Sequence, residues 1–115
     1  MKETIRRLLN EKTKEFEVCE YENNAVNGKR ELWKDDQLVV RAGYVENKLN
    51  GSFESWYDSG AKRIQCSYLH NELHGRYFSW WKNGNCKEVG QYNCGKRMSG
   101  YEWYDKNGSL IKVLD

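Results

Sequence analysis

The sequence predicts an all-β fold: an elongated, single-layer antiparallel β-meander of about four stacked hairpin repeats, with a short N-terminal helix. Three observations predict it. Glycines recur at a nearly constant spacing, and short runs rich in aromatic and β-branched residues alternate with Gly/Asn/Asp/Ser turns. Only 38% of the 115 residues are hydrophobic, yet 14% are aromatic. Because aromatic rings bury a large area each, they suit a thin sheet better than a thick globular core.

The repeat is visible in three columns of residues. The opening glycines are Gly28, Gly51, Gly75 and Gly100, which recur with a period of about 24 residues. The first strand of each unit ends in Trp33, Trp56, Trp80 or Tyr104, and the second strand ends in Tyr21, Tyr44, Tyr68 or Tyr92. A fixed period in this range indicates a stacked repeat protein. About 24 residues hold two strands and two turns without room for a helix, so each unit is expected to be a hairpin that pairs with the next.

The pattern G-x-[aromatic]-x-x-W-[aromatic]-x-x-G, followed by Y-x-x-[NG]-x-[LM]-x-G, resembles the MORN repeat. It is most similar to the variant of bacterial antitoxin-type proteins and of some large DNA viruses, over residues 21–108. The first unit departs from the pattern with Asp36-Gln37 in place of Ser-Gly or Asn-Gly, the third has an extra residue near Cys94-Gly95, and the fourth is one residue short after Gly100. The resemblance implies a non-enzymatic interaction or scaffold module, antitoxin-like in one version.

The N-terminal segment, residues 1–14, stands outside the repeat and is expected to form a capping helix, with the repeat domain over residues 15–115. Ile5, Leu8 and Leu9 have helical spacing, and Thr4 is a candidate N-cap. Such a helix would cover the first unpaired sheet edge; a partner-binding helix is the alternative. The strands are then expected at 16–21, 29–34, 38–44, 52–57, 62–68, 76–81, 86–92, 101–104 and 110–113.

Side chains alternate across a strand, and this predicts how the columns share the two faces. Each tyrosine of the second column follows a small residue by two positions, in the series Cys19, Ala42, Cys66 and Gly90. A small column leaves space, and the tryptophan column is the expected occupant. The predicted binding surface is therefore one aromatic face made of Trp33, Trp56, Trp80, Tyr104, Tyr44, Tyr68 and Tyr92. The opposite face is expected to be solvated, with the residues Arg41, Arg63, Gln65, Lys87, Gln91, Phe53, Tyr77 and Trp81.

Charge and hydropathy exclude several classes of function. The net charge is only +2, from 19 basic and 17 acidic residues, which argues against a nucleic-acid partner. No apolar run approaches the length of roughly 18 residues that a membrane-spanning helix needs. The segment 1–14 also lacks the apolar core of a signal peptide. We therefore expect a cytoplasmic protein, of a bacterium or of a virus-infected host cell.

The four cysteines are expected to be reduced. Cys19 and Cys66 occupy one column two hairpins apart, roughly 19 Å at the usual strand spacing, whereas a disulfide needs Cα atoms within about 7 Å. Cys86 and Cys94 are too far apart along one extended segment.

No catalytic, metal or cofactor site is expected. The run from His70 to His74 is not an H-E-x-x-H motif, and two histidines alone make an incomplete zinc site. A hydrolase with Cys66 or Cys94 as nucleophile would lack a third group to orient the histidine. The expected partner is another protein chain. The alternatives are self-association, a phospholipid headgroup as ligand, and a structural role in the assembly of a large DNA virus.

Overall fold

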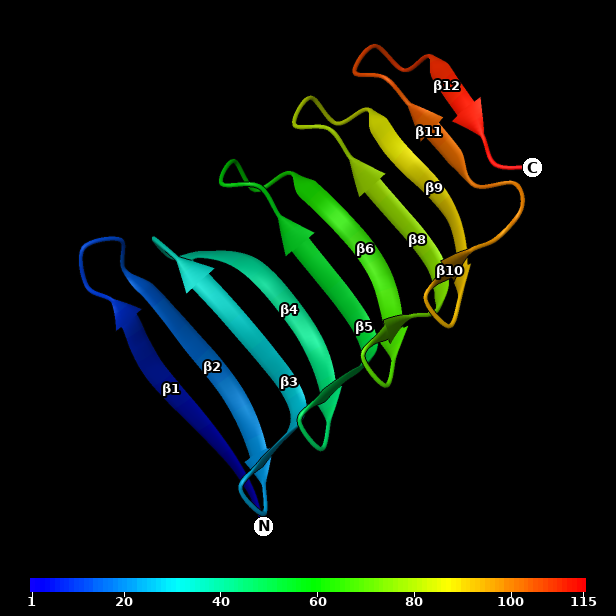
Figure 1. Ribbon diagram of the computed structural model, residues 1–115. Helices are drawn as coiled ribbons and strands as arrows, with labels where there is room; N and C mark the ends of the chain where they lie inside the picture. Colours follow the sequence, from blue (N-terminus) through cyan, green and yellow to red (C-terminus); the bar gives the residue numbers. More distant parts are fainter.

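A computed structural model of residues 1–115 confirms the predicted fold class. The chain forms one open antiparallel sheet of twelve strands and contains no helix. Figure 1 shows the strands following one another in chain order along a twisted ribbon, with the N- and C-terminal strands at opposite ends. The molecule measures 46 × 32 × 14 Å, so it is a single layer thick.

Ten strands form the main path of the sheet. They are β1 (Lys2–Asn10), β2 (Glu15–Glu22), β3 (Ala25–Lys34), β4 (Gln37–Val45), β5 (Lys48–Trp56), β6 (Lys62–Leu69), β8 (Gly75–Trp80), β9 (Cys86–Asn93), β11 (Glu102–Tyr104) and β12 (Leu110–Val113). Two short strands, β7 (Glu72–Leu73) and β10 (Lys96–Arg97), pair with β6 and β9 beside this path. The sheet therefore contains five hairpins, one more than the repeat count predicts.

The prediction of an N-terminal capping helix over residues 1–14 is wrong. β1 pairs with β2 in an antiparallel ladder from Lys2↔Glu22 to Asn10↔Glu15, and Arg7 lies opposite Glu17. A helix this short is marginal in water without an apolar surface to pack on. Pairing with β2 satisfies backbone groups that would otherwise stay open at the sheet edge. The fit of Ile5, Leu8 and Leu9 to a helical period is therefore overridden by tertiary pairing.

The turns between repeats are two-residue turns in which both residues have positive φ. They are Asn23-Asn24, Glu46-Asn47, His70-Asn71 and Cys94-Gly95. Asparagine tolerates this left-handed region better than most residues, which suits it to such turns. Each turn also contacts the preceding one: the Asn47 carboxamide accepts a hydrogen bond from the Val26 amide (2.8 Å), and the Asn71 carboxamide accepts one from the Leu49 amide (2.8 Å). These bonds connect consecutive repeats along one edge.

A register shift recurs near the other end of each hairpin. In four hairpins it falls at Leu32/Trp33, Ser55/Trp56, Ser79/Trp80 and Trp103/Tyr104. The first hairpin has its shift between Leu8 and Asn10. Such bulges increase the local twist of a strand pair.

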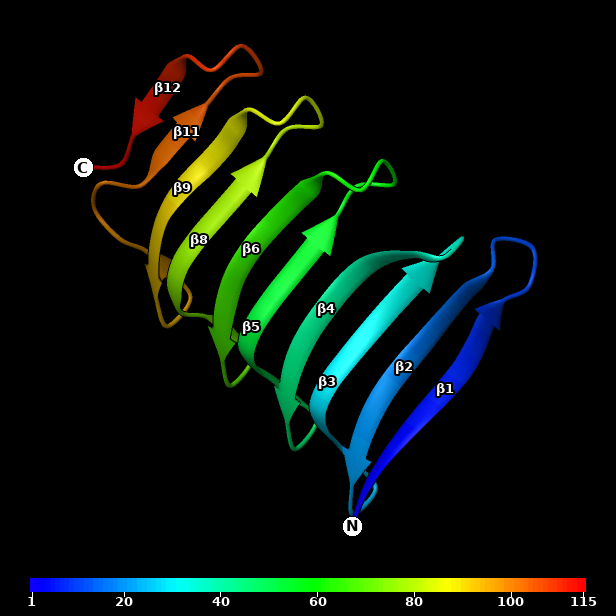
Figure 2. The ribbon, with the colours of Figure 1, turned by 180° about the vertical axis from the view of Figure 1, so that it is seen from behind.

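The two faces of the sheet differ sharply in burial. All eight buried residues lie on one face, the face of the tyrosine column: Glu17, Cys19, Ala42, Ser55, Cys66, Ser79, Tyr92 and Tyr101. We call this the tyrosine face. The opposite face bears Trp33, Trp56, Trp80 and Tyr104, all half-buried, and we call it the tryptophan face. Figure 2 shows the ribbon from behind, where the same strands form one uninterrupted layer.

The prediction that the tryptophans and tyrosines interlock on one face is therefore wrong. Gly51 pairs with Tyr68 and Phe53 pairs with Cys66, so these four residues share a face. Trp56 lies five positions after Gly51, an odd separation that puts its side chain on the other face. Gly28 and Trp33, and Gly75 and Trp80, have the same separation.

The space over the small column is filled by another aromatic column. Its members follow the opening glycines: Phe53, Tyr77 and Tyr101. The Phe53 and Tyr77 rings, expected on the solvated face, each make an edge contact at 5.5 Å with a tyrosine of the second column, Tyr68 and Tyr92 respectively. Tyr101 lies so close to Gly90 that a Cβ on that glycine would be 2.2 Å from the ring. Rings therefore pack over Ala42, Cys66 and Gly90, but they are not the tryptophans that the sequence predicted, and over Cys19 the larger side chain is Arg30.

Candidate functional site

The tryptophan face bears a row of four large aromatic side chains, which makes it a candidate surface for a ligand. Two of its rings stack on neighbours: Phe16 on Trp33, with centroids 5.9 Å apart, and Phe78 on Trp80, at 6.2 Å. Each of these pairs is nearly parallel, with planes within 1° and 14° respectively. The stacked rings therefore lie in fixed orientations before any partner binds. Their side chains would lose little conformational entropy on binding.

A chain of charged side chains connects the rings of this face across four strands. Arg41 contacts Glu31 at 3.1 Å and Glu54 at 4.0 Å, and Glu54 also pairs with Lys62. The Arg41 guanidinium and the Lys62 ammonium lie over the Trp56 ring, at 6.0 and 5.3 Å from its centroid. The face thus alternates aromatic rings with charges of both signs.

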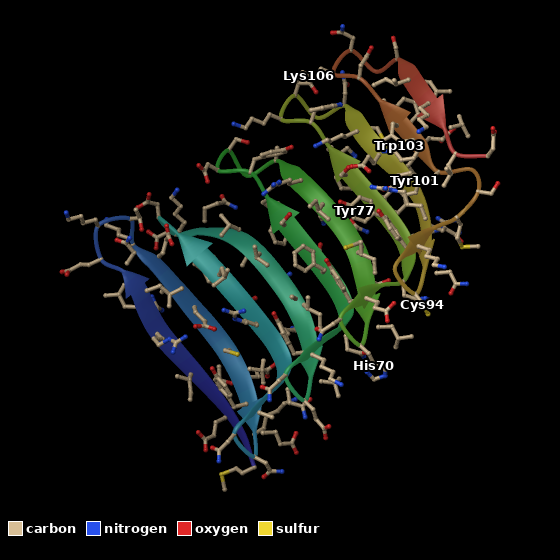
Figure 3. The ribbon with its side chains drawn as sticks, viewed as in Figure 1. His70, Tyr77, Cys94, Tyr101, Trp103 and Lys106 are labelled. Atoms are coloured by element: carbon tan, nitrogen blue, oxygen red, sulfur yellow. The ribbon has the colours of Figure 1, made fainter.

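At the C-terminal end of the tyrosine face, aromatic rings surround one cation. The Tyr101 ring contacts Tyr92 at 5.5 Å and Trp103 at 4.8 Å, and its hydroxyl donates a hydrogen bond to Glu88 (2.9 Å). The Arg97 guanidinium lies over all three rings, at 5.1 to 5.7 Å from their centroids. Burial raises the pKa of Tyr101, and hydrogen bonds with Tyr92 and Glu88 raise it further. Figure 3 shows Tyr77 on β8 and, across β9, Tyr101 and Trp103 at β11.

At the N-terminal end of the same face, an ionic network replaces the rings. Glu17 is buried and accepts hydrogen bonds from Arg30 Nε and from Arg7 Nη2, both at 2.7 Å. Burial alone would raise the pKa of Glu17, but the bonds from Arg30 and Arg7 outweigh it and hold the pKa below its ordinary value of 4.5. At both ends of the tyrosine face, side chains of the protein itself therefore cover the small residues of the sheet.

His74 and Cys94 meet at one edge of the sheet. His74 Nδ1 accepts a hydrogen bond from the Cys94 backbone amide (3.1 Å), and the Cys94 sulfur lies 3.7 Å from the same nitrogen. Asn50 makes the equivalent contact one repeat earlier, to the His70 amide (3.2 Å), so His74 takes a structural position of the repeat. Figure 3 places His70 and Cys94 at the same turn edge.

All four cysteines are free, as predicted. Burial raises the pKa of Cys66 to about 12, so this thiol is a poor nucleophile at neutral pH. No group of three or more His, Cys, Asp and Glu side chains is placed to hold a metal ion.

The residues predicted to make one binding face are divided between both faces. Trp33, Trp56, Trp80 and Tyr104 remain together in one row, whereas Tyr44, Tyr68 and Tyr92 lie behind them on the tyrosine face. Sequence reasoning also missed Phe16 and Phe78 as neighbours of the row, and a basic cleft at the turn edge beside Tyr57 and Trp81. The signal for the first omission was available, because Phe78 precedes Trp80 by two positions and so shares its face.

No protein-family model matches the chain, and no curated protein matches its sequence. No helix in the structure has the length and apolar character needed to span a membrane.

Proposed function

We propose that this chain is a non-enzymatic protein-interaction module of the MORN type, and that its tryptophan face holds an extended segment of another protein chain. The observation that supports this is the row of Trp33, Trp56, Trp80 and Tyr104, half-buried on the face that contains none of the buried residues. Tryptophan and tyrosine dominate the energetics of protein interfaces once they are desolvated. An antitoxin that neutralises a toxin would be one form of such binding.

The dimensions and charges of the row favour an extended segment as its occupant. Four repeats at about 10 Å per two strands give a row of roughly 30 Å, which about nine extended residues would cover. The charges between the rings carry both signs, as in the run from Glu31 through Arg41 to Glu54. A partner with alternating polar and apolar side chains could therefore satisfy both the rings and the charges.

Two adjacent tryptophans on opposite faces provide a matched test. A partner captured from the native host would be purified and titrated against the wild type, Trp80→Ala and Trp81→Ala. We expect Trp80→Ala to weaken binding by more than about 1 kcal/mol, and Trp81→Ala to have a smaller effect, with circular dichroism showing the sheet retained in both. The reverse order would move the site to the turn edge that Trp81 lines, and no effect from either variant would exclude both the tryptophan row and that edge.

The outer strands support self-assembly as a second candidate function. β1 exposes Ile5 (45%) and Leu8 (61%), and β12 exposes Leu110 (51%) and Ile111 (64%). Unpaired strand edges with apolar side chains tend to pair with another strand. If copies join edge to edge, light scattering should show a mass that grows with concentration, and Leu8→Lys with Ile111→Lys should reduce it to that of a monomer. A monomer at all concentrations would eliminate this candidate.

A further inference from the structure

A basic cleft lies at the turn edge of the sheet, away from the tryptophan row. Its volume is about 450 Å³, within the usual range for small-molecule sites. It is lined by Tyr57, Trp81, Lys82, Asn83, Lys87 and Lys106. These residues come from the ends of three successive hairpins, and Figure 3 shows Lys106 at the edge opposite His70 and Cys94.

Hydrogen bonds between repeats hold the walls of the cleft in place. The Tyr57 hydroxyl donates to the Trp80 carbonyl (2.7 Å), and Trp81 Nε1 donates to the Tyr104 carbonyl (3.1 Å). The Asn83 carboxamide donates to the Lys106 carbonyl (2.8 Å), which fixes the next turn against this one. The stacking of the repeats therefore forms the cleft, and it is present before any ligand binds.

Four cations surround the two rings. Relative to the ring centroid of Trp81, the ammonium groups of Lys87 and Lys106 lie at 4.7 and 5.5 Å. The ammonium of Lys82 and the guanidinium of Arg63 lie 5.9 and 5.8 Å from the Tyr57 centroid. Contacts between cations and ring faces explain how like charges are held together here.

The positive charge of the cleft is not compensated by acids. None of the four cations has a carboxylate oxygen within 4 Å. Of the acids in adjoining hollows, Asp58 lies 4.0 Å from Lys34, and Glu88 is shared between Tyr101 and Arg97. On the tryptophan face, by contrast, Arg41 and Lys62 share Glu54.

We propose that this cleft binds a soluble ligand with at least two adjacent phosphate groups, of the pyrophosphate or nucleoside diphosphate class. The ammonium group of a lysine acts as a point charge and binds phosphate oxygens well. A ligand with two phosphate groups carries more negative charge than a single carboxylate, and so matches several clustered lysines better. Lys87 is half-buried, so its attraction for an anion is screened less than that of a fully solvated lysine. The proposal does not depend on the protein partner of the tryptophan face.

Calorimetric titration with inorganic pyrophosphate tests the proposal. We expect saturable binding of one equivalent, which weakens as salt is added because the contacts are electrostatic. The variant Lys82→Gln with Lys106→Gln should lower the affinity at least about tenfold, equivalent to about 1.4 kcal/mol. The matched control is Lys48→Gln with Lys96→Gln, which removes the same charge from two exposed lysines that do not line the cleft; it should bind almost as the wild type does.

Three outcomes would overturn the proposal. The first is no binding of pyrophosphate at low salt. The second is an equal loss of affinity in both double variants, which would show attraction by net charge alone. The third is binding to vesicles that contain phosphorylated headgroups without competition from pyrophosphate, which would assign the cleft to a membrane surface.

Discussion

At the N-terminal end of the tyrosine face, the side chain over the small column is Arg30; at the C-terminal end it is Tyr101. The two occupy the same place in the repeat, and so do Glu17 and Glu88, which are three repeats apart. Glu17 accepts hydrogen bonds from Arg30 and Arg7. Glu88 instead accepts a hydrogen bond from the Tyr101 hydroxyl and lies 3.8 Å from Arg97. One backbone arrangement thus supports two different cores.

The difference shows what each end needs from its neighbours. A buried carboxylate is tolerated only while its partners are present, so the ionic end depends on three particular side chains. Aromatic packing depends on area and shape, and the middle repeats use Phe53 and Tyr77 in the same place. Repeat proteins accept such exchange because each unit contacts only the units beside it.

The largest expected effect is at the aromatic end. Tyr101 is fully buried and contacts three rings, so Tyr101→Ala should lower the free energy of unfolding by about 3–5 kcal/mol, the usual range for a buried aromatic. Urea unfolding measures it. Tyr104→Ala, on the tryptophan face, should cost clearly less, and so should Trp56→Ala, because both rings are half-exposed. An equal loss from Tyr101 and Tyr104 would mean that the core does not lie on the tyrosine face.

The ionic end should respond less, but with a dependence on pH. Glu17→Gln keeps the shape and removes the charge, and we expect a loss of about 2 kcal/mol at neutral pH, since both arginines are partly solvated. The pKa of Glu17 is lower in the folded protein, so its stabilising contribution is complete above its ordinary pKa of 4.5 and disappears as the pH falls below it. The difference between wild type and Glu17→Gln should therefore shrink in acid. A difference that stays constant down to pH 2 would contradict the network.

The period and turn residues were sufficient to predict the strands of the repeat. They did not predict β1, because its structure is decided by pairing with β2. The local spacing of apolar residues within β1 carries no information about that pairing. The assignment of columns to faces could have been made from the sequence: Trp56 lies five positions after Gly51, and an odd count places two residues on opposite faces.

The basic cleft was harder to anticipate from the sequence. Lys82 and Lys106 are one repeat apart, and Lys87 belongs to a different strand, so no short motif contains them. Their convergence depends on the turns of three hairpins lying side by side, which only the stacking of repeats produces. Column analysis extended to the turns would have found the pair Tyr57 and Trp81, which are also one repeat apart.

The smallest expected effect is in the middle of the sheet, at a position that the two ends fill with larger side chains. The series is Leu32, Ser55, Ser79 and Trp103. The hydroxyls of Ser55 and Ser79 are buried without a hydrogen-bond partner, and such a group destabilises the folded state by about 1–3 kcal/mol.

Ser79→Ala removes that hydroxyl and leaves the Cβ in place, so it should raise the free energy of unfolding by about 1 kcal/mol, measured by urea unfolding. Ser67→Ala is the control, because the Ser67 hydroxyl donates to the His74 carbonyl and its loss should destabilise the protein. If Ser79→Ala destabilises the protein as Ser67→Ala does, its hydroxyl has a partner. The middle repeats would then be held by a polar contact of their own, and the contrast between ionic and aromatic ends would describe only the two ends of the sheet.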